Sequence, residues 1–479
     1  MGTSTVIADG WGWRFGANPS LGIAGGSFTI APGERVLLLG PSGSGKSTLL
    51  RALAGVLGDD EGQQIGSLRI GGEPPHEVRG RVGLVLQDPE TQTIAARVGD
   101  DVAFGCENLG VAREEIWRRV EAALESVDLR VPRDHDTAHL SGGQKQRLAL
   151  AGAIAMAPEI LLLDEPTANL DPAGALQVRD AVIASVESRA TTVVVVDHNA
   201  DLWWDFVDRI LLLDASGALV VDSTPRDVLA SSSAFLSGLG VWAPDAHLDS
   251  MAAGSVGDSE ILLHARDVVV GRRNQSPVSM PPAIEVSAGQ FMAVTGPNGS
   301  GKTTLALTLG GLLAPVSGQV NAGPSLARGL RTEPIRWSSR QLARRIGNVF
   351  QSPEHQFVRA TVREELLLGA HLAGLRARQA EQEVDDLLDT LHLTKHANAH
   401  PFTLSGGQKR RLTVGAAIAS RPTLLVLDEP TFGQDAHTWR ELVQLMETLR
   451  SEGCSIVAAT HDGRLSARAD RILTLGARS

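Results

Sequence analysis

The sequence has little cysteine, no tyrosine and no long apolar run. Cys106 and Cys454 are the only cysteines among 479 residues, so neither a disulfide framework nor a cysteine-bound metal or iron–sulfur centre is expected. No segment approaches the roughly 18 to 20 consecutive apolar residues that a membrane-spanning helix requires. The N-terminal residues lack the basic region and apolar stretch of a secretory signal. These absences predict a cytoplasmic protein that reaches a membrane only through a partner.

Positive charge is also scarce. Lys and Arg number 44 against 55 Asp and Glu, which gives a formal net charge of −11. A protein that wraps nucleic acid neutralises phosphates with clustered Lys and Arg. The charge balance therefore predicts no nucleic-acid partner.

Four motifs occur twice, in the same order. With the first residue of each copy, they are GPSGSGKST (Gly40) and GPNGSGKTT (Gly296), LSGGQKQRL (Leu140) and LSGGQKRRL (Leu404), LLLDEPT (Leu161) and LVLDEPT (Leu425), and a histidine after a strand (His198 and His461). The two copies lie 256, 264, 264 and 263 residues apart. Such constant spacing indicates duplicated domains. We expect the eight extra residues of the second copy to form a longer loop around residues 322–339.

Each half alternates short apolar runs with helical patterns, which predicts an α/β domain with a mainly parallel sheet. The clearest predicted strands are Val36–Leu39, Ile160–Leu163, Val193–Val196 and Ile210–Leu213. In the first half, the segment 219–229 predicts one more hairpin strand and a helix. Residues 236–258 lack periodicity and are rich in Gly, Ala, Ser and Asp, which is typical of a flexible linker. The predicted domains are therefore residues 1–235 and 259–479.

The first repeated motif fits the phosphate loop GxxxxGK[ST]. Its glycines let backbone N–H groups surround phosphates, and the following helix directs its positive end at them. Lys46 and Lys302 should reach the β- and γ-phosphates of a nucleotide, while Ser47 and Thr303 should bind Mg²⁺. The predicted nucleotide-binding residues of the two loops are Gly40, Pro41, Ser42, Gly43, Ser44, Gly45, Lys46, Ser47 and Thr48, and Gly296, Pro297, Asn298, Gly299, Ser300, Gly301, Lys302, Thr303 and Thr304.

An acidic pair ends the LLLDEPT and LVLDEPT strands. Asp164 and Asp428 stand where an aspartate would hold Mg²⁺. Glu165 and Glu429 follow directly, where a carboxylate can orient the attacking water and act as general base. Two ordinary surface acids at strand ends are the alternative interpretation, which the register with the phosphate loops disfavours.

Polar residues after other strands complete the predicted sites. Gln87 and Gln351 follow short strands and are predicted to contact Mg²⁺ or the water. His198 and His461 are predicted to be catalytic. A lone glutamine is usually solvated and a lone histidine is more often structural, so these predictions rest on equal placement in the two repeats.

The LSGGQ segments precede apolar helices around residues 148–156 and 412–418. Exposed N–H groups and a hydroxyl at a helix start form an anion site. A single copy could be only a helix cap, but two copies placed identically beside phosphate loops predict phosphate binding. The residues concerned are Ser141, Gly142, Gly143 and Gln144, and Ser405, Gly406, Gly407 and Gln408.

Together, these motifs resemble the ATP-binding cassette (ABC) superfamily over nearly the whole of both halves. The resemblance implies two P-loop NTPase domains, each with a mainly parallel sheet core, an antiparallel β part and a helical subdomain, at about residues 88–158 and 352–422. It implies ATP and Mg²⁺ as cofactors and ATP hydrolysis coupled to transport. It also implies head-to-tail pairing of the halves. ATP at Lys46 would be capped by Ser405–Gly407 and ATP at Lys302 by Ser141–Gly143, with Asp171 and Asp435 in loops at the seam.

A finer resemblance is to energy-coupling factor (ECF) vitamin and metal importers. It is carried by QDPETQ (Gln87–Gln92), QSPEHQ (Gln351–Gln356) and DDVAFGCENLG (Asp100–Gly110), and less closely by REELLLGA (Arg363–Ala370). It implies an integral membrane coupling subunit, a small substrate-capture subunit that selects the substrate, and a place at the cytoplasmic face of the cell membrane. The two glutamine-rich segments would receive the coupling helices.

Some features depart from the family pattern. Without tyrosine, the aromatic residue that stacks on adenine must be another, and Phe15 or Trp13 fits in the first half, whereas none occurs around residues 268–273. The seam loop FGQD (Phe432–Asp435) replaces ANLD of the first half, which suggests unequal sites. Both halves keep the expected lysine, acids, histidine and facing signature, so both are expected to hydrolyse ATP.

Three alternatives were weighed against the importer. A soluble tandem ABC ATPase acting on ribosomes or DNA usually carries a long charged helical linker, but this linker is short and weakly charged. A sugar-importer ATPase typically has a drifted second signature, but this one is intact. A non-catalytic scaffold would lack Glu165 or Lys46, which are both present.

Overall fold

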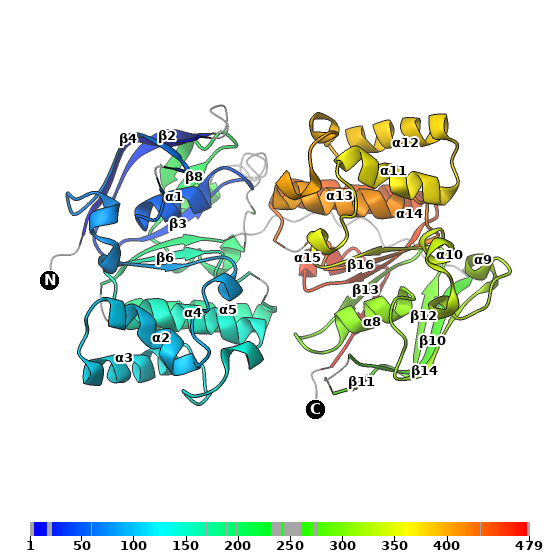
Figure 1. Cartoon of the computed structure of the whole chain (residues 1–479), viewed down its shortest axis with the longest axis horizontal. Helices are drawn as coiled ribbons and strands as arrows, with labels where there is room; N and C mark the ends of the chain where they lie inside the picture. Colours follow the sequence, from blue (N-terminus) through cyan, green and yellow to red (C-terminus); the bar gives the residue numbers. More distant parts are fainter. Residues whose placement is uncertain are drawn as a thin grey trace. The chain divides into compact units, whose positions relative to one another are not determined.

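A computed structural model describes residues 4–16, 22–58, 60–168, 170–187, 190–197, 199–230, 242, 260–272, 276–431 and 433–476. They form two compact units that divide near residue 246 (Figure 1). Within these ranges, no helix is both long enough and apolar enough to cross a membrane. The predicted linker 236–258 lies outside the described residues, apart from Trp242.

The first unit is built on a six-stranded sheet of order β5-β6-β7-β3-β8-β9. Its strands are β3 (Arg35–Leu39), β5 (Val82–Val85), β6 (Ile160–Asp164), β7 (Thr192–Val196), β8 (Arg209–Leu213) and β9 (Leu219–Ser223). Neighbouring strands are parallel except for the antiparallel pair β8–β9. The four apolar runs predicted as strands are β3, β6, β7 and β8. The hairpin strand β9 and the helix α6 (Pro225–Ala230) confirm the predicted continuation.

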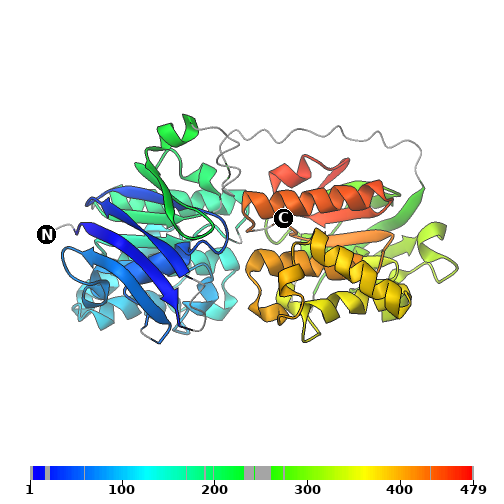
Figure 2. The same cartoon turned by 90° about the horizontal axis from the view of Figure 1, so that it is seen from above.

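Alternate side chains of these strands enter two different cores, because successive residues of a strand point to opposite faces. Leu37 and Leu39 pack on one face with α2 (Val98–Asn108), α3 (Arg113–Ser126), α4 (Gly142–Ala155) and α5 (Pro172–Glu187). Val36 and Leu38 pack on the other face with α1 (Lys46–Leu53) and an antiparallel sheet of β1 (Val6–Phe15), β2 (Gly22–Ile30) and β4 (Gly62–Ile70). In Figure 2 the blue strands of this antiparallel sheet face the viewer as a separate layer.

The second unit repeats this plan with a five-stranded parallel sheet of order β15-β16-β17-β13-β18. The strands are β13 (Phe291–Thr295), β15 (Ile346–Val349), β16 (Leu424–Asp428), β17 (Ser455–Ala459) and β18 (Arg471–Thr474). Its antiparallel sheet contains β10 (Ile261–Val270), β11 (Val278–Ser279), β12 (Ala283–Ser287) and β14 (Ser317–Ala322). The helices are α8 (Lys302–Leu309), α10 (Ser339–Ala343), α11 (Val362–Ala373), α12 (Ala377–Thr390), α13 (Gly406–Ile418), α14 (Ala436–Ser451) and α15 (Gly463–Ser466).

The segment 322–339 differs from the open loop expected from the sequence. It contains the short helix α9 (Pro324–Ala327) and a 3₁₀ turn, Pro334–Arg336. Leu326 and Trp337 are buried in the core of the second unit, and the Trp337 indole N–H donates to the Arg331 carbonyl at 2.7 Å. Apolar anchors therefore fold the extra residues onto the domain, and the prediction of a simple longer loop was wrong.

Candidate functional site

The two phosphate loops lie between the end of a central strand and the start of a helix. Gly45 and Gly301 cap α1 and α8 with φ of 93° and 94°, which is left-handed backbone that favours glycine. A Cβ on Gly45 would lie 2.5 Å from the Ile23 side chain. Glycine is therefore required here by both backbone and space, and each helix directs its N-terminal N–H groups into the loop.

The loop lysines are folded back onto their own loops. Lys46 Nζ donates to the carbonyl oxygens of Gly40 and Pro41 at 2.8 and 2.9 Å, and Lys302 makes the same pair of contacts in the second unit. Lys46 is buried, which lowers the pKa of its ammonium group, and nearby Glu165 acts in the opposite direction. A buried cation held only by carbonyl dipoles is well placed to gain from an anionic phosphate.

A hydroxyl and a carboxylate meet at each predicted Mg²⁺ position. Ser47 Oγ donates to Asp164 Oδ1 at 3.1 Å, and Thr303 Oγ1 donates to Asp428 Oδ1 at 3.0 Å. Oxygen atoms of this kind suit Mg²⁺, which usually takes its other ligands from water and substrate phosphates. The described residues contain no cluster of three or more His, Cys, Asp or Glu that could hold a metal ion by itself. The donor set therefore fits Mg²⁺ bound together with a nucleotide.

The two predicted general bases share an unusual backbone conformation. Glu165 and Glu429 have φ of 49° and 48°, in the left-handed region that residues other than glycine rarely adopt. Their amide N–H groups donate to the Val196 and Ala459 carbonyls of the neighbouring strands at 2.7 and 2.9 Å. Such a conformation costs about 1–3 kcal/mol and tends to occur at functional sites. Its presence at the same position of both units supports a functional role for both glutamates.

Burial shifts the ionisation of the second glutamate. Glu429 is 5% exposed, and burial raises its pKa to about 7. Asp428 raises it further, while the His461 backbone N–H, which donates to Glu429 Oε2 at 3.2 Å, lowers it. Burial also raises the pKa of Asp428. A carboxyl group that titrates near neutrality is matched to proton abstraction from water.

The two predicted glutamines are placed differently. Gln87 Nε2 donates to Glu165 Oε2 at 2.6 Å, so this side chain reaches the predicted base. In the second unit, the carbonyl of Gln351 accepts from Arg410 Nη2 at 2.7 Å, and Arg410 Nη1 donates to the Phe350 carbonyl at 2.9 Å. The interaction of Gln351 is thus through its backbone, and the two sites differ at this point.

Arg410 is a site residue that the sequence interpretation missed. It is 4% exposed, and burial lowers the pKa of its guanidinium to about 10, while Asp428 and Glu429 act in the opposite direction. Its counterpart 264 residues earlier is Gln146. The signal was the single difference between LSGGQKQRL and LSGGQKRRL.

The glutamine-rich segments are fixed in the same way in both units. Gln92 Oε1 accepts from the Leu86 N–H at 2.7 Å and its Nε2 donates to the Leu84 carbonyl at 3.0 Å, and Gln356 makes the matching contacts at 2.9 Å each. Ion pairs of 2.8 and 2.5 Å, Lys145–Glu90 and Lys409–Glu354, join each segment to its signature helix. The last glutamine of each motif is therefore structural, and the first follows the strand that leads to the predicted base.

One of the two predicted catalytic histidines can be located. His461 Nε2 lies 2.9 Å from Asn298 Oδ1 in the phosphate loop and 3.7 Å from Glu429 Oε1. His198 and Phe432 lie outside the described residues.

A buried carboxylate holds each histidine segment to the segment that follows the predicted base. Asp197 accepts from Thr167 Oγ1 at 2.7 Å and Trp203 Nε1 at 3.0 Å, and burial raises its pKa. Asp462 accepts from Thr431 Oγ1 at 2.8 Å and Trp439 Nε1 at 2.5 Å. The threonines are equivalent, but the aspartate precedes the histidine in one unit and follows it in the other. The units therefore build the same contact from different positions.

The signature segments begin helices. Ser141 and Ser405 are the N-caps of α4 and α13, and each forms a capping box with the glutamine three residues later, Gln144 or Gln408. The glycines expected to precede these helices form their first turn instead. Ser141 and Ser405 are exposed, so the helix N-termini are open to an anion.

The two candidates for adenine stacking differ in exposure. Trp13 is 5% exposed and belongs to the core of the first unit, which removes it as a candidate. Phe15 is only partly buried at the end of β1 and remains the candidate.

Comparisons with known proteins agree with this geometry. A model of the family described as ABC transporter matches residues 23–168 and 281–432. A Bacillus subtilis protein named as an HMP/thiamine import ATP-binding protein, YkoD, is 33% identical over 94% of this chain and 86% of its own length. A Methanosarcina acetivorans protein named as an ABC transporter ATP-binding protein is 33% identical over 93% of this chain and 80% of its own length.

A solved structure shares the fold over most of the chain. It is an archaeal ribosome recycling factor, aABCE1, in complex with the ribosomal stalk protein aP1. It is similar with a TM-score of 0.64 and 21% identity over 97% of this chain and 87% of its own. The duplicated phosphate loops, signatures and acidic strand ends, together with the family match in both halves, show that the chain belongs to the ABC transporter family as a tandem ABC ATPase.

Proposed function

We propose that this ATPase energises a membrane importer of the ECF type, which carries a vitamin, a vitamin precursor or a metal ion. The observation that carries the proposal is an exposed apolar residue at the same place beside both glutamine-rich segments. Ile94 is 64% exposed and Val358, 264 residues later, is 68% exposed. Singly exposed apolar residues are common, but an equivalent pair beside a motif typical of ECF importers supports a docking surface.

The second unit has a hollow beside this residue. A pocket of about 290 Å³ is lined by Phe350, Gln356, Phe357, Val358 and further apolar residues of α10, α11 and α13. An apolar groove of this kind fits the side chains of a helix from a partner. We assign the partner as the integral membrane coupling subunit, which would work with a substrate-capture subunit at the cytoplasmic face of the membrane. The thiamine-related name of the Bacillus relative is in keeping with this class of cargo.

Within each unit, the chain's own residues divide the work of hydrolysis. The phosphate-loop amides and Lys46 or Lys302 bind the nucleotide phosphates, and the paired hydroxyl and aspartate hold Mg²⁺, which would neutralise charge on the transferred phosphoryl group. Glu165 or Glu429 orients water and takes its proton, and His461 lies beside Glu429 in the second unit.

In the proposed assembly, residues 1–235 and 259–479 are the two ATPase domains and 236–258 the linker. Each signature segment would cap the nucleotide bound by the other domain. Both sites would hydrolyse ATP, and Glu165→Gln and Glu429→Gln made separately would each lower turnover.

The test of the importer proposal is copurification with membrane proteins. Ile94→Asp combined with Val358→Asp should abolish capture of a membrane coupling subunit and leave ATP binding intact. Val220→Asp, on a side chain that is 45% exposed on β9, is the matched control and should change nothing. Salt-sensitive cosedimentation with ribosomes or DNA, without any membrane partner, would instead support the soluble alternative and contradict the importer.

A further inference from the structure

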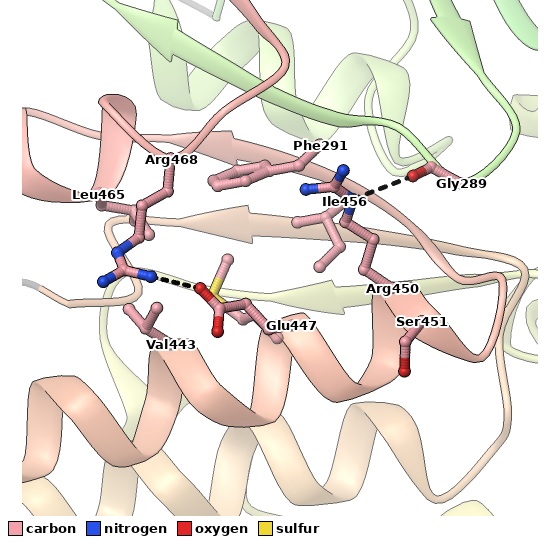
Figure 3. A pocket seen from close by; sticks show the side chains of 10 residues that line it. Gly289, Phe291, Val443, Glu447, Arg450, Ser451, Ile456, Leu465 and Arg468 are labelled. Atoms are coloured by element: carbon pink, nitrogen blue, oxygen red, sulfur yellow. Dashed lines mark hydrogen bonds and ion pairs between the residues drawn. The ribbon is translucent and has the colours of Figure 1, made fainter. Parts of the chain in front are cut away.

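The second unit contains a pocket on the side of its sheet covered by α14 (Figure 3). Its volume is about 420 Å³, within the range typical of small-molecule sites. Phe291 and Ile456 come from β13 and β17, Val443 and Met446 from α14, and Leu465 from α15. Charged groups border these apolar walls, and Figure 3 shows side chains from all three sources pointing into the same space.

The equivalent space of the first unit is filled. There, the five-residue segment 203–207 places Trp203, Trp204 and Phe206 in the core, with 0%, 7% and 5% exposure. The corresponding segment of the second unit, 466–469, has four residues, Ser-Ala-Arg-Ala. Three large aromatic side chains are thus replaced by small ones, which accounts for the hollow.

The second unit also has charge where the first is apolar. The α14 residues Glu447 and Arg450 correspond, 264 residues earlier, to Ile183 and Val186 of α5. Arg450 Nε donates to the Gly289 carbonyl at 3.3 Å. A void left only by smaller side chains would be lined by apolar atoms. The change of two buried apolar positions into charged ones points to a polar function instead.

An arginine and a phenylalanine have exchanged places around the same aspartate. In the first unit, Asp208 accepts from Arg35 Nη2 at 2.6 Å, and the Arg35 guanidinium covers the Phe206 ring at 5.1 Å. In the second unit, Phe291 occupies the strand position of Arg35, and the ion pair is made to Asp470 by Arg450 at 2.9 Å.

This exchange turns an aromatic face toward the pocket and brings a guanidinium to its edge. Arg468, which pairs with Glu447 at 2.5 Å, stands at the opposite side. Two guanidinium groups and one carboxylate line the pocket, so its lining side chains carry one net positive charge.

We propose that this pocket binds a small amphipathic monoanion, with a flat apolar body and one carboxylate or sulfonate group, and that the bound anion regulates the second ATP site. The apolar body would contact Phe291 and Ile456. The anionic group would lie between Arg450 and Arg468, since guanidinium pairs well with planar anions.

The pocket is joined to the second ATP site through α14 and α15. Leu465, in its wall, lies four residues after His461, and Arg468 Cζ lies 5.6 Å from the Trp439 ring centre. Trp439 in turn donates to Asp462, which caps α15. A ligand that moves α15 against α14 would therefore move the segment that carries His461. This regulatory part rests on the proposed role of the second site in hydrolysis, whereas binding does not.

Binding can be tested on the full chain with naphthalene-2-carboxylate as the probe and methyl-¹³C-methionine NMR as the readout. The chain has six methionines, and Met446 lines the pocket, whereas Met156 and Met292 do not. The Met446 resonance, assigned with Met446→Leu, should shift saturably while those of Met156 and Met292 stay unchanged. Neutral naphthalene-2-carboxamide should bind at least about tenfold more weakly, because it lacks the charge-assisted hydrogen bonds.

Two variants identify the groups responsible. Arg468→Gln should bring carboxylate affinity down to that of the carboxamide, and Arg471→Gln, on a neighbouring exposed arginine, is the matched control. Val443→Phe should abolish binding by filling the pocket. The fold should tolerate it, because the equivalent helix position of the first unit holds Arg179. An unmoved Met446 resonance, or equal binding of carboxylate and carboxamide, would overturn the proposed site.

The regulatory part has a separate readout. In a Glu165→Gln background, saturating naphthalene-2-carboxylate should change the ATP turnover that remains by at least about twofold, and Val443→Phe should remove the effect. Binding without any change in turnover would overturn regulation and leave the site standing. Loss of turnover in every variant, with normal binding, would count against the proposed hydrolytic role instead.

Discussion

Replacing Arg410 with glutamine tests the clearest structural difference between the two ATP sites. Arg410 holds the strand end at Phe350 and Gln351 through two carbonyl contacts, of 2.9 and 2.7 Å. Gln146 stands at the same position of the first unit. The substitution therefore makes the second unit resemble the first at this position without introducing a foreign residue.

Two opposing terms set the size of the effect. Hydrogen bonds to charged groups contribute about 1.5–3 kcal/mol each, so the loss of two would cost about 3–6 kcal/mol. Burial lowers the pKa of Arg410 from 12.5 to about 10. At about 1.4 kcal/mol per pKa unit, removal of the buried charge returns roughly 3 kcal/mol. The hydrogen bonds win by a small margin, and we expect the free energy of unfolding to fall by about 1–3 kcal/mol.

Urea unfolding of the full chain measures this change, and amide hydrogen exchange locates it. Exchange should accelerate at residues 346–351 and in α13 and stay unchanged in the first unit. The matched control is Gln146→Met, which should be neutral or stabilising, because the described residues give its buried amide no hydrogen-bond partner. Unchanged stability and unchanged exchange in the Arg410→Gln variant would refute the argument that this guanidinium anchors the strand end.

Further predictions concern the loop, the core and the base. Gly45→Ala should abolish ATP binding, because its Cβ would clash at 2.5 Å, whereas Gly43→Ala, which has open space but φ of 83°, should weaken binding less; equilibrium binding measures both. Leu161→Ala, at a side chain 1% exposed, should cost about 2–5 kcal/mol in urea unfolding. With Glu165→Gln, single-turnover hydrolysis at saturating Mg-ATP should rise with pH and level above 7, because Glu429, whose pKa is about 7, acts only when deprotonated; a flat profile from pH 6 to 8 would contradict this.

The strands and loops could be predicted from the sequence because their causes are local. Val193–Val196 is a continuous β-branched run, and such a run forms a strand buried on both faces. The glycines of the phosphate loops are required by backbone conformation and close contact, which a motif records directly. Asp164 and Glu165 were placed correctly beside the loop because parallel strands all end at one edge of the sheet.

The rest depended on contacts between distant segments. The left-handed conformation of Glu165 and Glu429 is imposed by the neighbouring strand, and no local pattern announces it. Arg410 looked like one more basic residue of an exposed helix until the fold buried it against Phe350. The pocket beside Phe291 arises from three elements far apart in the chain, and only comparison of the two units reveals it.

The carboxylates Asp197 and Asp462 bear on how the halves have diverged. Each needs an indole partner, and the partner has moved along with the acid, from residue 203 after the histidine in one half to residue 439 on the preceding helix in the other. A chimera that exchanged only the histidine segments would leave one half with a buried acid facing no indole. Although they descend from one ancestor, the halves are no longer interchangeable parts here, since acid and indole can be swapped only together.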